Sequence, residues 1–362
     1  MKVLVALSGG VDSAVAALRL KQQGCTLSAV YMRTWMSEEE DIVADCPWLQ
    51  DMQEAQRVAE HLDIPFKMLN MVDTYKTHVV TALVEGYKLG LTPNPDIFCN
   101  QHVKFGALVD YALAEGFDYL ATGHYCQKKT SLEGLCSLHE GKDPKKDQSY
   151  FLARVRHDKL QRALFPLGEL HKKDVRVLAE EAGLSNAQRK DSQGICFLGK
   201  VPINDFLKHY IPDQPGAIVD KEGKVLGEHL GLHRYTLGQR KHLNIPSNRD
   251  FENYVVLKKD YASNTLIIGF EGAMEQELYQ DSAQLESLHS LIQEPEWLEE
   301  TKSLPMLART RYQEPTQPVL WSYKGKGRGE VLFSRPQRAL TPGQVLAFYR
   351  GTQLIGSGVY TV

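Results

Sequence analysis

Val3-Leu4-Val5-Ala6-Leu7, followed at once by Ser8-Gly9-Gly10-Val11-Asp12-Ser13, is the stretch that decides the fold. Its first five residues form a short, unbroken apolar run, which is typical of a buried parallel strand. The next residues, from Ala14 to Leu20, keep the apolar spacing of a helix, so a strand-to-helix turn is expected between them. Adjacent glycines let the backbone approach a ligand closely, and N–H groups at a helix start attract anions. The turn therefore predicts a phosphate site in which Asp12 orients a metal ion or a water.

A Gly-Gly pair alone would favour an ordinary Gly-rich turn. The complete six-residue sequence from Ser8 to Ser13 is more specific than that pair. It has neither the glycine and lysine spacing of the Walker loop nor the dinucleotide-binding fingerprint. Ser8 to Ser13 resembles the PP-loop of the ATP pyrophosphatases, enzymes that split ATP into AMP and pyrophosphate to activate an oxygen on a second substrate. This resemblance implies ATP as a cosubstrate and leaves the acceptor open.

Length and composition indicate a globular protein of two or three domains. The chain has 362 residues, of which 43% are hydrophobic, and a formal net charge of −3. That charge gives no overall attraction to nucleic acid, so any polyanion site must be a local patch. The N-terminus has no apolar stretch long enough for export or for crossing a bilayer, so we expect a cytoplasmic protein without a membrane partner.

The cysteines do not follow a metal-binding or disulfide-framework pattern. There are six, in a long chain without an apparent signal peptide, so most are expected to be reduced. None belongs to a Cys-x-x-Cys pair, and we predict no protein-ligated metal site. Cys99 and Cys196 each lie in an irregular, loop-like segment, where they are either packing residues or thiols that face a bound nucleotide.

Strands and helices alternate over the first half of the chain. Strands are expected at 26–32, 66–71 and 119–122, and helices at 48–62, 74–89, 105–115 and 173–182. This alternation predicts a doubly wound parallel sheet, of the α/β class, with its ligands at the carboxyl ends of the strands. Met32 lies at such an end, where it either packs in the core or covers an adenine ring.

Two segments of this half are expected to leave regular structure. The prolines in Thr92-Pro93-Asn94-Pro95-Asp96 predict an exposed turn. Residues 128–146 are polar and read as a hairpin or surface loop with lysines near its end. Those lysines suit contact with a phosphate backbone, although solvated lysines are the commoner explanation.

The alternation stops near residue 203, and short strands with turns follow. We predict a catalytic domain at 1–202, a small central β-rich domain at 203–275 and a C-terminal β-barrel domain at 276–362.

Longer motifs place the chain near one family. In order along the chain, several stretches are similar to those of the bacterial tRNA-specific 2-thiouridylases, and together they span nearly its whole length: Thr92 to Asn100, Ala121 to Tyr125, Lys146 to Leu152, Asp191 to Phe197, Tyr235 to Lys241 and Pro336 to Gln344.

The resemblance implies a mechanism. ATP adenylates O2 of the wobble uridine of tRNA, and pyrophosphate leaves. Cys196, carrying a persulfide sulfur, attacks C2, and Cys99 resolves the intermediate to give 2-thiouridine, AMP and a Cys99–Cys196 disulfide. Asp96 acts as the acid or base at the target base. His102 and Lys104 would favour a Cys99 thiolate if they approach it.

The family's binding residues carry over by position. Target-base contacts fall on Asn94, Pro95 and Asp96, and Mg²⁺ is expected with ATP. An upstream persulfide carrier or cysteine desulfurase is implied as the sulfur source. The nucleotide site is Ala6, Leu7, Ser8, Gly9, Gly10, Val11, Asp12, Ser13, Met32 and Gly123. The tRNA contacts are His124, Lys146, Asp147, Gln148, Arg311, Tyr312 and Gln344. For Arg311 and Tyr312, simple alternation on a surface strand is an equal explanation.

Some features depart from the family or favour other functions. Arg33-Thr34-Trp35 replaces the usual Asn before Trp, His242 replaces the Gly after Gln-Arg-Lys, and the acidic segment 38–45 has no assigned role. A nitrogen-delivering PP-loop ligase would need no cysteine pair. An inactive RNA-binding protein would be expected to lose the loop or a cysteine. An iron–sulfur cluster on Cys99, Cys196 and a third thiol is a further alternative.

Overall fold

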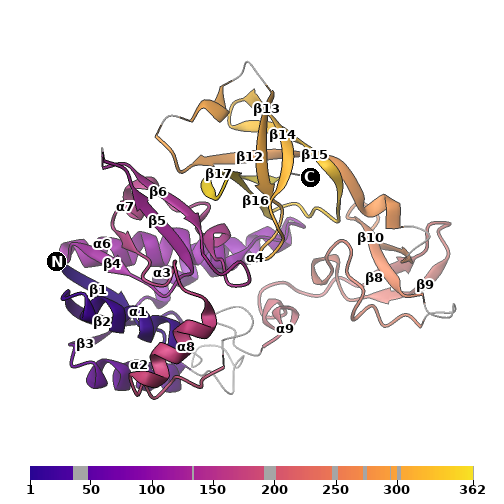
Figure 1. Ribbon diagram of the computed structural model, residues 1–362. Helices are drawn as coiled ribbons and strands as arrows, with labels where there is room; N and C mark the ends of the chain where they lie inside the picture. Colours follow the sequence, from indigo (N-terminus) through magenta and orange to yellow (C-terminus); the bar gives the residue numbers. More distant parts are fainter. Residues whose placement is uncertain are drawn as a thin grey trace.

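The computed structural model describes residues 1–35, 48–132, 134–190, 201–246, 252–271, 275–293, 295–299 and 303–361. Its strands form a five-stranded, a four-stranded and an eight-stranded sheet. Figure 1 shows the N-terminal half at the left, the C-terminal strands above it and the four-stranded sheet at the right. The expected architecture of a parallel α/β sheet, a small central β region and a C-terminal β-barrel is confirmed.

The five-stranded sheet is parallel and has the order β3-β2-β1-β4-β7. The central strand β1 pairs on both sides, with Val3 opposite Leu27 of one neighbour and Tyr119 of the other. The strands are β1 (Lys2–Ala6), β2 (Thr26–Arg33), β3 (Phe66–Asn70), β4 (Tyr119–Ala121) and β7 (Ala163–Leu164). Strand β1 is therefore central in the sheet, and Val3, Leu4 and Val5 are buried, as its unbroken apolar run predicts.

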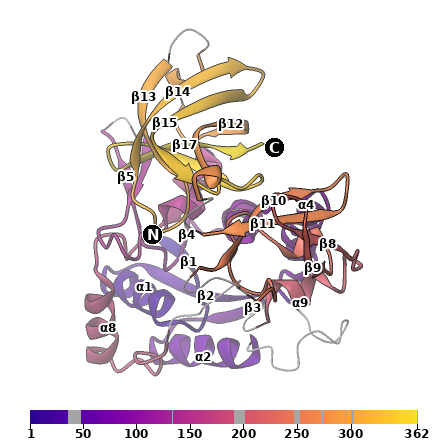
Figure 2. The ribbon, with the colours of Figure 1, turned by 90° about the vertical axis from the view of Figure 1, so that its right-hand side faces the viewer.

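Helices cover both faces of this sheet, and alternate residues of β1 pack against different helices. Val3 and Val5 join a core with α1 (Val11–Gln22), α2 (Trp48–His61) and α8 (Lys172–Glu181). Leu4 faces the opposite core, which includes Leu108 of α6 (Leu108–Ala114). Figure 2 shows α1, α2 and α8 beside the sheet. These helices begin and end within a few residues of the predicted ranges.

The helix predicted at 74–89 is confirmed as one uninterrupted helical run. It consists of α3 (Val72–Tyr75), a π-helical turn at Lys76–Val80 and α4 (Thr81–Lys88). The exposed turn predicted at 92–96 is wrong, because Pro93 and Pro95 are buried and Pro95 starts the helix α5 (Pro95–Phe98). A proline fits the first helical position, where its missing N–H has no intrahelical partner. A longer π-helix, Cys99–Ala107, then leads into α6.

Residues 128–146 include a hairpin, and it joins the C-terminal sheet. Its strands are β5 (Cys126–Thr130) and β6 (Cys136–Glu140), and Leu138 of β6 pairs with Leu354 near the end of the chain. The 3₁₀ turn Ser149–Leu152 and the short helix α7 (His157–Gln161) return the chain to β7. The first half of the sequence therefore contributes strands to a sheet built mostly from the last eighty or so residues.

The four-stranded sheet has the order β10-β11-β8-β9 and follows the short helix α9 (Ile203–Leu207). A 3₁₀ turn, Leu232–Arg234, follows β9. His242, which replaces a family glycine, is exposed and has a φ of 63°, a left-handed conformation that glycine adopts without strain. The strands are β8 (Gly216–Val219), β9 (Val225–His229), β10 (Tyr254–Asp260) and β11 (Thr265–Phe270).

The C-terminal strands close into a barrel because β12 pairs with both β15 and β17. Its interior contains Trp297, Trp321 and Phe348, whose rings lie 4.8 to 5.9 Å apart. Two 3₁₀ turns, Glu275–Leu278 and Glu296–Leu298, flank β12. The strands are β12 (Tyr279–Ser290), β13 (Ser303–Arg309), β14 (Gln317–Gly325), β15 (Arg328–Arg338), β16 (Val345–Arg350) and β17 (Gln353–Tyr360).

Candidate functional site

The Ser8–Ser13 turn is a pre-shaped loop at the start of α1. The Ser13 hydroxyl accepts a hydrogen bond from the Ser8 amide at 3.1 Å and donates one to the Gly10 carbonyl at 3.0 Å. The Ser8 hydroxyl in turn accepts from the Gly10 amide at 3.4 Å. The first N–H groups of α1, after Gly10, have no intrahelical acceptor and carry the positive end of the helix dipole. The loop is therefore closed on itself by its serines and presents amides to an anion.

Gly9 supports this loop through a conformation that only glycine adopts readily. Its φ is +78°, and a Cβ at this position would lie 2.4 Å from the Asp51 carbonyl oxygen. Its own carbonyl accepts hydrogen bonds from Asn186 at 3.0 Å and from Arg189 at 3.1 Å, and Arg189 also forms an ion pair with Asp51. Residues of α2 and of the segment after α8 thus fix the loop from behind.

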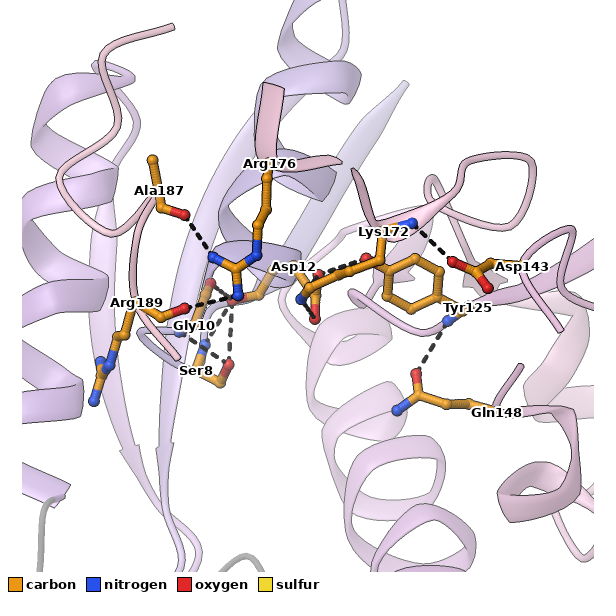
Figure 3. A network of polar contacts seen from close by, with 11 residues as sticks. Ser8, Gly10, Asp12, Tyr125, Asp143, Gln148, Lys172, Arg176, Ala187 and Arg189 are labelled. Carbon is orange, nitrogen blue, oxygen red and sulfur yellow. Dashed lines mark hydrogen bonds and ion pairs between the residues drawn. The ribbon is translucent and has the colours of Figure 1, made fainter. Parts of the chain in front are cut away.

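Asp12 lies at the centre of a charged network (Figure 3). Lys172, the first residue of α8, donates to its carboxylate oxygens at 2.7 and 2.8 Å, and the Tyr125 hydroxyl donates at 2.6 Å. The Lys172 amide donates to Asp143 at 2.9 Å, and the Tyr125 amide donates to the side-chain oxygen of Gln148 at 3.1 Å. The network places an ammonium group beside the only carboxylate of the Ser8–Ser13 loop, where phosphate charge would be attracted.

The other predicted nucleotide residues lie on the neighbouring strands. Gly123 follows β4 and touches the loop so closely that a Cβ there would lie 2.7 Å from the Ser13 amide nitrogen. Ala6 and Met32 are partly buried, and Met32 contacts two apolar cores, one of them containing Cys99. Gly123 therefore belongs to the loop by contact, whereas Met32 is packed in the protein and its contact with adenine stays a prediction.

These residues fit a nucleotide triphosphate with its magnesium ion. Backbone amides and Lys172 offer donors and positive charge to phosphate oxygens, and Asp12 offers a carboxylate of the kind that Mg²⁺ uses together with phosphates.

The segment that holds Asp96 is ordered by a helix cap. The side-chain oxygen of Asn94 accepts hydrogen bonds from the amides of Asp96 at 3.0 Å and Ile97 at 3.3 Å. The Asn100 side chain donates to the Asp96 carbonyl at 3.0 Å. Burial raises the pKa of the Asp96 carboxyl, and the nearby charge of Lys104 partly opposes this effect. A carboxyl with a raised pKa exchanges a proton more readily near neutral pH, which suits an acid or base.

Cys99 begins the π-helix and is 4% exposed, in an apolar cluster that includes Trp35 and Phe206. His102, three residues further along this π-helix, stacks on His78 with ring centroids 5.0 Å apart. Burial, and then the charges of His78 and Arg154, lower the pKa of His102, so this imidazole is mainly neutral at pH 7. A positive His102 that assists a Cys99 thiolate is therefore not supported. Cys196 and its motif lie outside the described residues, as does the acidic segment 38–45.

Two residues expected to contact tRNA are buried. His124 is 8% exposed, packs between Phe105 and Phe165, and lies 2.7 Å from the Thr122 hydroxyl. Its pKa is well below the usual value because of burial, with a smaller effect from Lys104. Asp147 is 4% exposed and forms an ion pair with Arg309 of β13, which also pairs with Glu140. Both side chains have protein partners, and their contact with RNA stays a prediction.

The remaining predicted tRNA residues are partly exposed, and most have protein partners. Lys146 follows the β5–β6 hairpin, and Gln148 is hydrogen bonded to the Tyr125 amide. Arg311 donates to the Arg338 and Ala339 carbonyls at 2.9 and 2.5 Å. The Tyr312 ring lies 4.2 Å from Phe151, and the side-chain amide of Gln344 donates to the Thr92 carbonyl. Contact of these residues with RNA stays a prediction.

Sequence reasoning missed the residues that support the loop from a distance. Lys172, Tyr125, Asn186 and Arg189 lie more than 100 positions from their partners in the loop. Lys172 had one local signal, because a cation at the first position of a helix is unfavourable unless an acidic partner lies nearby.

The fold and the loop define a class: a doubly wound α/β nucleotide-binding protein with appended β domains. Family models match the chain in three parts, described as a tRNA methyl transferase HUP domain at residues 1–200, a tRNA methyl transferase PRC-barrel domain at 204–270 and an aminomethyltransferase β-barrel domain at 285–360.

Full-length relatives then give the family. A tRNA-specific 2-thiouridylase of Akkermansia muciniphila is 46% identical over 99% of this chain and 98% of its own length. The corresponding enzyme of Streptococcus sanguinis is 40% identical over 99% and 95%. A solved 4-thiouridine synthetase–RNA complex with bound ATP is 17% identical, with a TM-score of 0.37, and covers 57% of this chain and 50% of that chain. The protein belongs to the tRNA-specific 2-thiouridylase family.

None of the described helices is long and apolar enough to cross a membrane.

Proposed function

We propose that this chain is an ATP-dependent tRNA uridine 2-sulfurtransferase that converts the wobble uridine to 2-thiouridine, with AMP and pyrophosphate as the other products. One observation carries the proposal. The backbone of Gly123 lies against Asp12 and Ser13 of the phosphate loop, and the charge of Lys104 influences both the next residue, His124, and the Asp96 carboxyl. The phosphate loop and the partly buried Asp96 carboxyl are thus linked through Gly123, His124 and Lys104, an arrangement that suits adenylation of a bound base.

In the first step the protein binds ATP and activates O2 of the uridine. The amides at the start of α1 and the ammonium of Lys172 hold the triphosphate, and Asp12 would hold the Mg²⁺ that neutralises phosphate charge when ATP is bound. The uridine O2 attacks the α-phosphorus, the bond to pyrophosphate breaks, and an adenylated base results. Asp96 exchanges the proton of the base. A wobble base must leave its stack for this reaction, which favours recognition of a flexible anticodon loop.

In the second step sulfur replaces the activated oxygen. The terminal sulfur of a Cys196 persulfide attacks C2, and AMP departs with the former O2. The Cys99 thiolate then attacks the Cys196 sulfur, the S–S bond breaks, and its electrons remain on the sulfur attached to C2. The products are 2-thiouridine and a Cys99–Cys196 disulfide, which a reductant must reopen. A persulfide carrier or cysteine desulfurase supplies the sulfur. Burial of Cys99 in an apolar cluster supports a thiol shielded from bulk oxidants.

The test is a thiolation assay with purified enzyme, ATP, a persulfide donor and unmodified tRNA, followed by mass spectrometry of the digested tRNA. We expect 2-thiouridine from the wild-type enzyme and none from Cys196→Ser. Cys99→Ser should release pyrophosphate and fail to complete thiolation. Product formation by Cys196→Ser would contradict the mechanism, and full activity of Cys99→Ser would make Cys99 a packing residue. Iron in anaerobically purified protein would favour a cluster on these cysteines instead.

A further inference from the structure

The loop that joins β15 to β16 of the barrel binds the chain just before Asn94. The Thr92 amide donates to the Pro342 carbonyl at 2.8 Å, and the Gln344 side-chain amide donates to the Thr92 carbonyl. Both backbone polar groups of Thr92 are therefore held by residues some 250 positions away. Thr92 itself lies four residues before Asp96, so the barrel contacts the approach to the proposed acid or base.

The barrel side of this contact is firmly built. The Gln344 amide donates to the Thr341 carbonyl at 3.1 Å, and the Gln344 carbonyl accepts from the Tyr360 amide at 2.9 Å. Gly343 has a φ of +89°, and a Cβ there would lie 2.9 Å from the Leu91 Cβ and 3.0 Å from the Thr92 nitrogen. The contact is too close to admit a side chain at Gly343, so the β15–β16 loop packs directly against the backbone of Leu91 and Thr92.

The path from Thr92 to Asp96 is stiff. Pro93 is buried against α4, where a Cβ on Gly86 would lie 2.6 Å from the proline ring. Pro95 fixes a second φ angle, and the Asn94 side chain closes the turn onto the Asp96 amide. Two proline rings and a cap leave few torsions free over these residues. A displacement of Thr92 is therefore passed on to Asp96 rather than absorbed.

We infer that Gln344 is a positioning residue for the reaction: its hydrogen bond to Thr92 sets the placement of Asp96 at the target base. This inference rests on the proposed function and deepens it. It assigns Gln344 a role through the protein, in contrast to the direct RNA contact expected from the family resemblance. The two roles make opposite predictions about binding and rate, because a positioning residue acts after tRNA has bound.

The experiment compares Gln344→Ala and Gln344→Glu with the wild-type enzyme. Glutamate keeps the shape of glutamine and lacks the N–H donor, so it faces the Thr92 carbonyl with a negative charge. For each protein, single-turnover thiolation is measured at saturating tRNA and ATP, and the Kd for tRNA is measured separately. Gln280→Ala, at an exposed site of β12 in the same barrel, is the control.

We expect both Gln344 variants to bind tRNA within about twofold of the wild-type Kd and to thiolate about 10- to 100-fold more slowly, since misplacing a reacting group by about 1 Å costs about 100-fold. The Glu variant should be at least as slow as the Ala variant, and Gln280→Ala should match the wild type. Matching melting temperatures would exclude a loss of folded enzyme.

A wild-type rate in both Gln344 variants would overturn the positioning role while leaving the proposed function intact. Direct RNA contact would instead raise the Kd for tRNA tenfold or more, most in the Glu variant, and leave the rate at saturating tRNA unchanged. That result would overturn the positioning role. A wild-type enzyme that makes no 2-thiouridine would overturn the proposed function and this inference together.

Discussion

The phosphate loop and the Asp96 segment are positioned in different ways, although both serve one proposed reaction. Ser8–Ser13 is shaped by its own serines and by residues of the same α/β region, such as Arg189 and Lys172. The approach to Asp96 is held from outside that region: by Lys259 of β10, which donates to the Gly90 carbonyl at 3.2 Å, and by Gln344 next to β16. ATP activation is therefore built into one domain, whereas the encounter with the base depends on all three sheets.

The largest effect is expected where the barrel is anchored to the catalytic region. Arg309 is buried between Asp147 and Glu140, and Arg309→Met leaves the buried Asp147 and the partly buried Glu140 carboxylates without their cation. Breaking a buried ion pair on one side costs about 3 to 5 kcal/mol. We expect a loss of this size in the free energy of unfolding measured in urea, with ATP still bound by the protein that remains folded.

The control for this change is Arg350→Met on the same barrel. Arg350 and its partner Glu296 are 62% and 72% exposed, so the loss should stay below about 1 kcal/mol. Equal losses from both variants would show that the Arg309 cluster does not join the two regions.

The phosphate loop is tested by Gly9→Ala. A left-handed φ costs a non-glycine residue about 1 to 2 kcal/mol, and the new Cβ also meets the Asp51 carbonyl. We expect pyrophosphate release to fall about 100-fold at subsaturating ATP. Gly24→Ala separates the two causes, because Gly24 has a φ of +77° and its Cβ would meet nothing within 4 Å. The Gly24→Ala variant should be less stable but release pyrophosphate at the wild-type rate. A loss of activity as large as in Gly9→Ala would contradict the explanation by contact with the Asp51 carbonyl.

The smallest effect concerns Lys259 and is visible only as a pH dependence. Burial lowers the pKa of Lys259 from 10.5 to about 8. Between these values the unfolded chain holds the proton that the folded protein has released, so Lys259 makes stability rise with pH over this window. Measured against Lys259→Met, this rise should amount to about 2 to 3 kcal/mol between pH 8 and 10.5. The exposed neighbour provides the control, Lys258→Met, which should parallel the wild type. If stability depends on pH in the same way in Lys259→Met and in the wild type, the amine of Lys259 stays hydrated in the folded protein.

Local patterns were sufficient for the sheet and for the loop. The unbroken apolar run of β1 predicts a buried strand, and the adjacent Gly9 and Gly10 predict a tight turn. The structure contains both. The prolines of 92–96 were misread because the rule that prolines interrupt helices has an exception at the first helical position. The burial of Asp147 was not predicted because its partner, Arg309, lies 162 positions away. Contacts between residues so far apart leave no local pattern in the sequence. The partners of Asp12, Gly9 and Asp147 could therefore not be predicted.

The pairing of β6 with β17 also has a consequence for the order in which the molecule is made. The hairpin β5–β6 leaves the ribosome about 200 residues before its partner strand. At about 5 to 20 residues per second, the outer edge of β6 waits roughly 10 to 40 s for a neighbour. An unpaired strand edge is a template for pairing with other chains. During this interval the edge of β6 is therefore open to pairing between nascent chains.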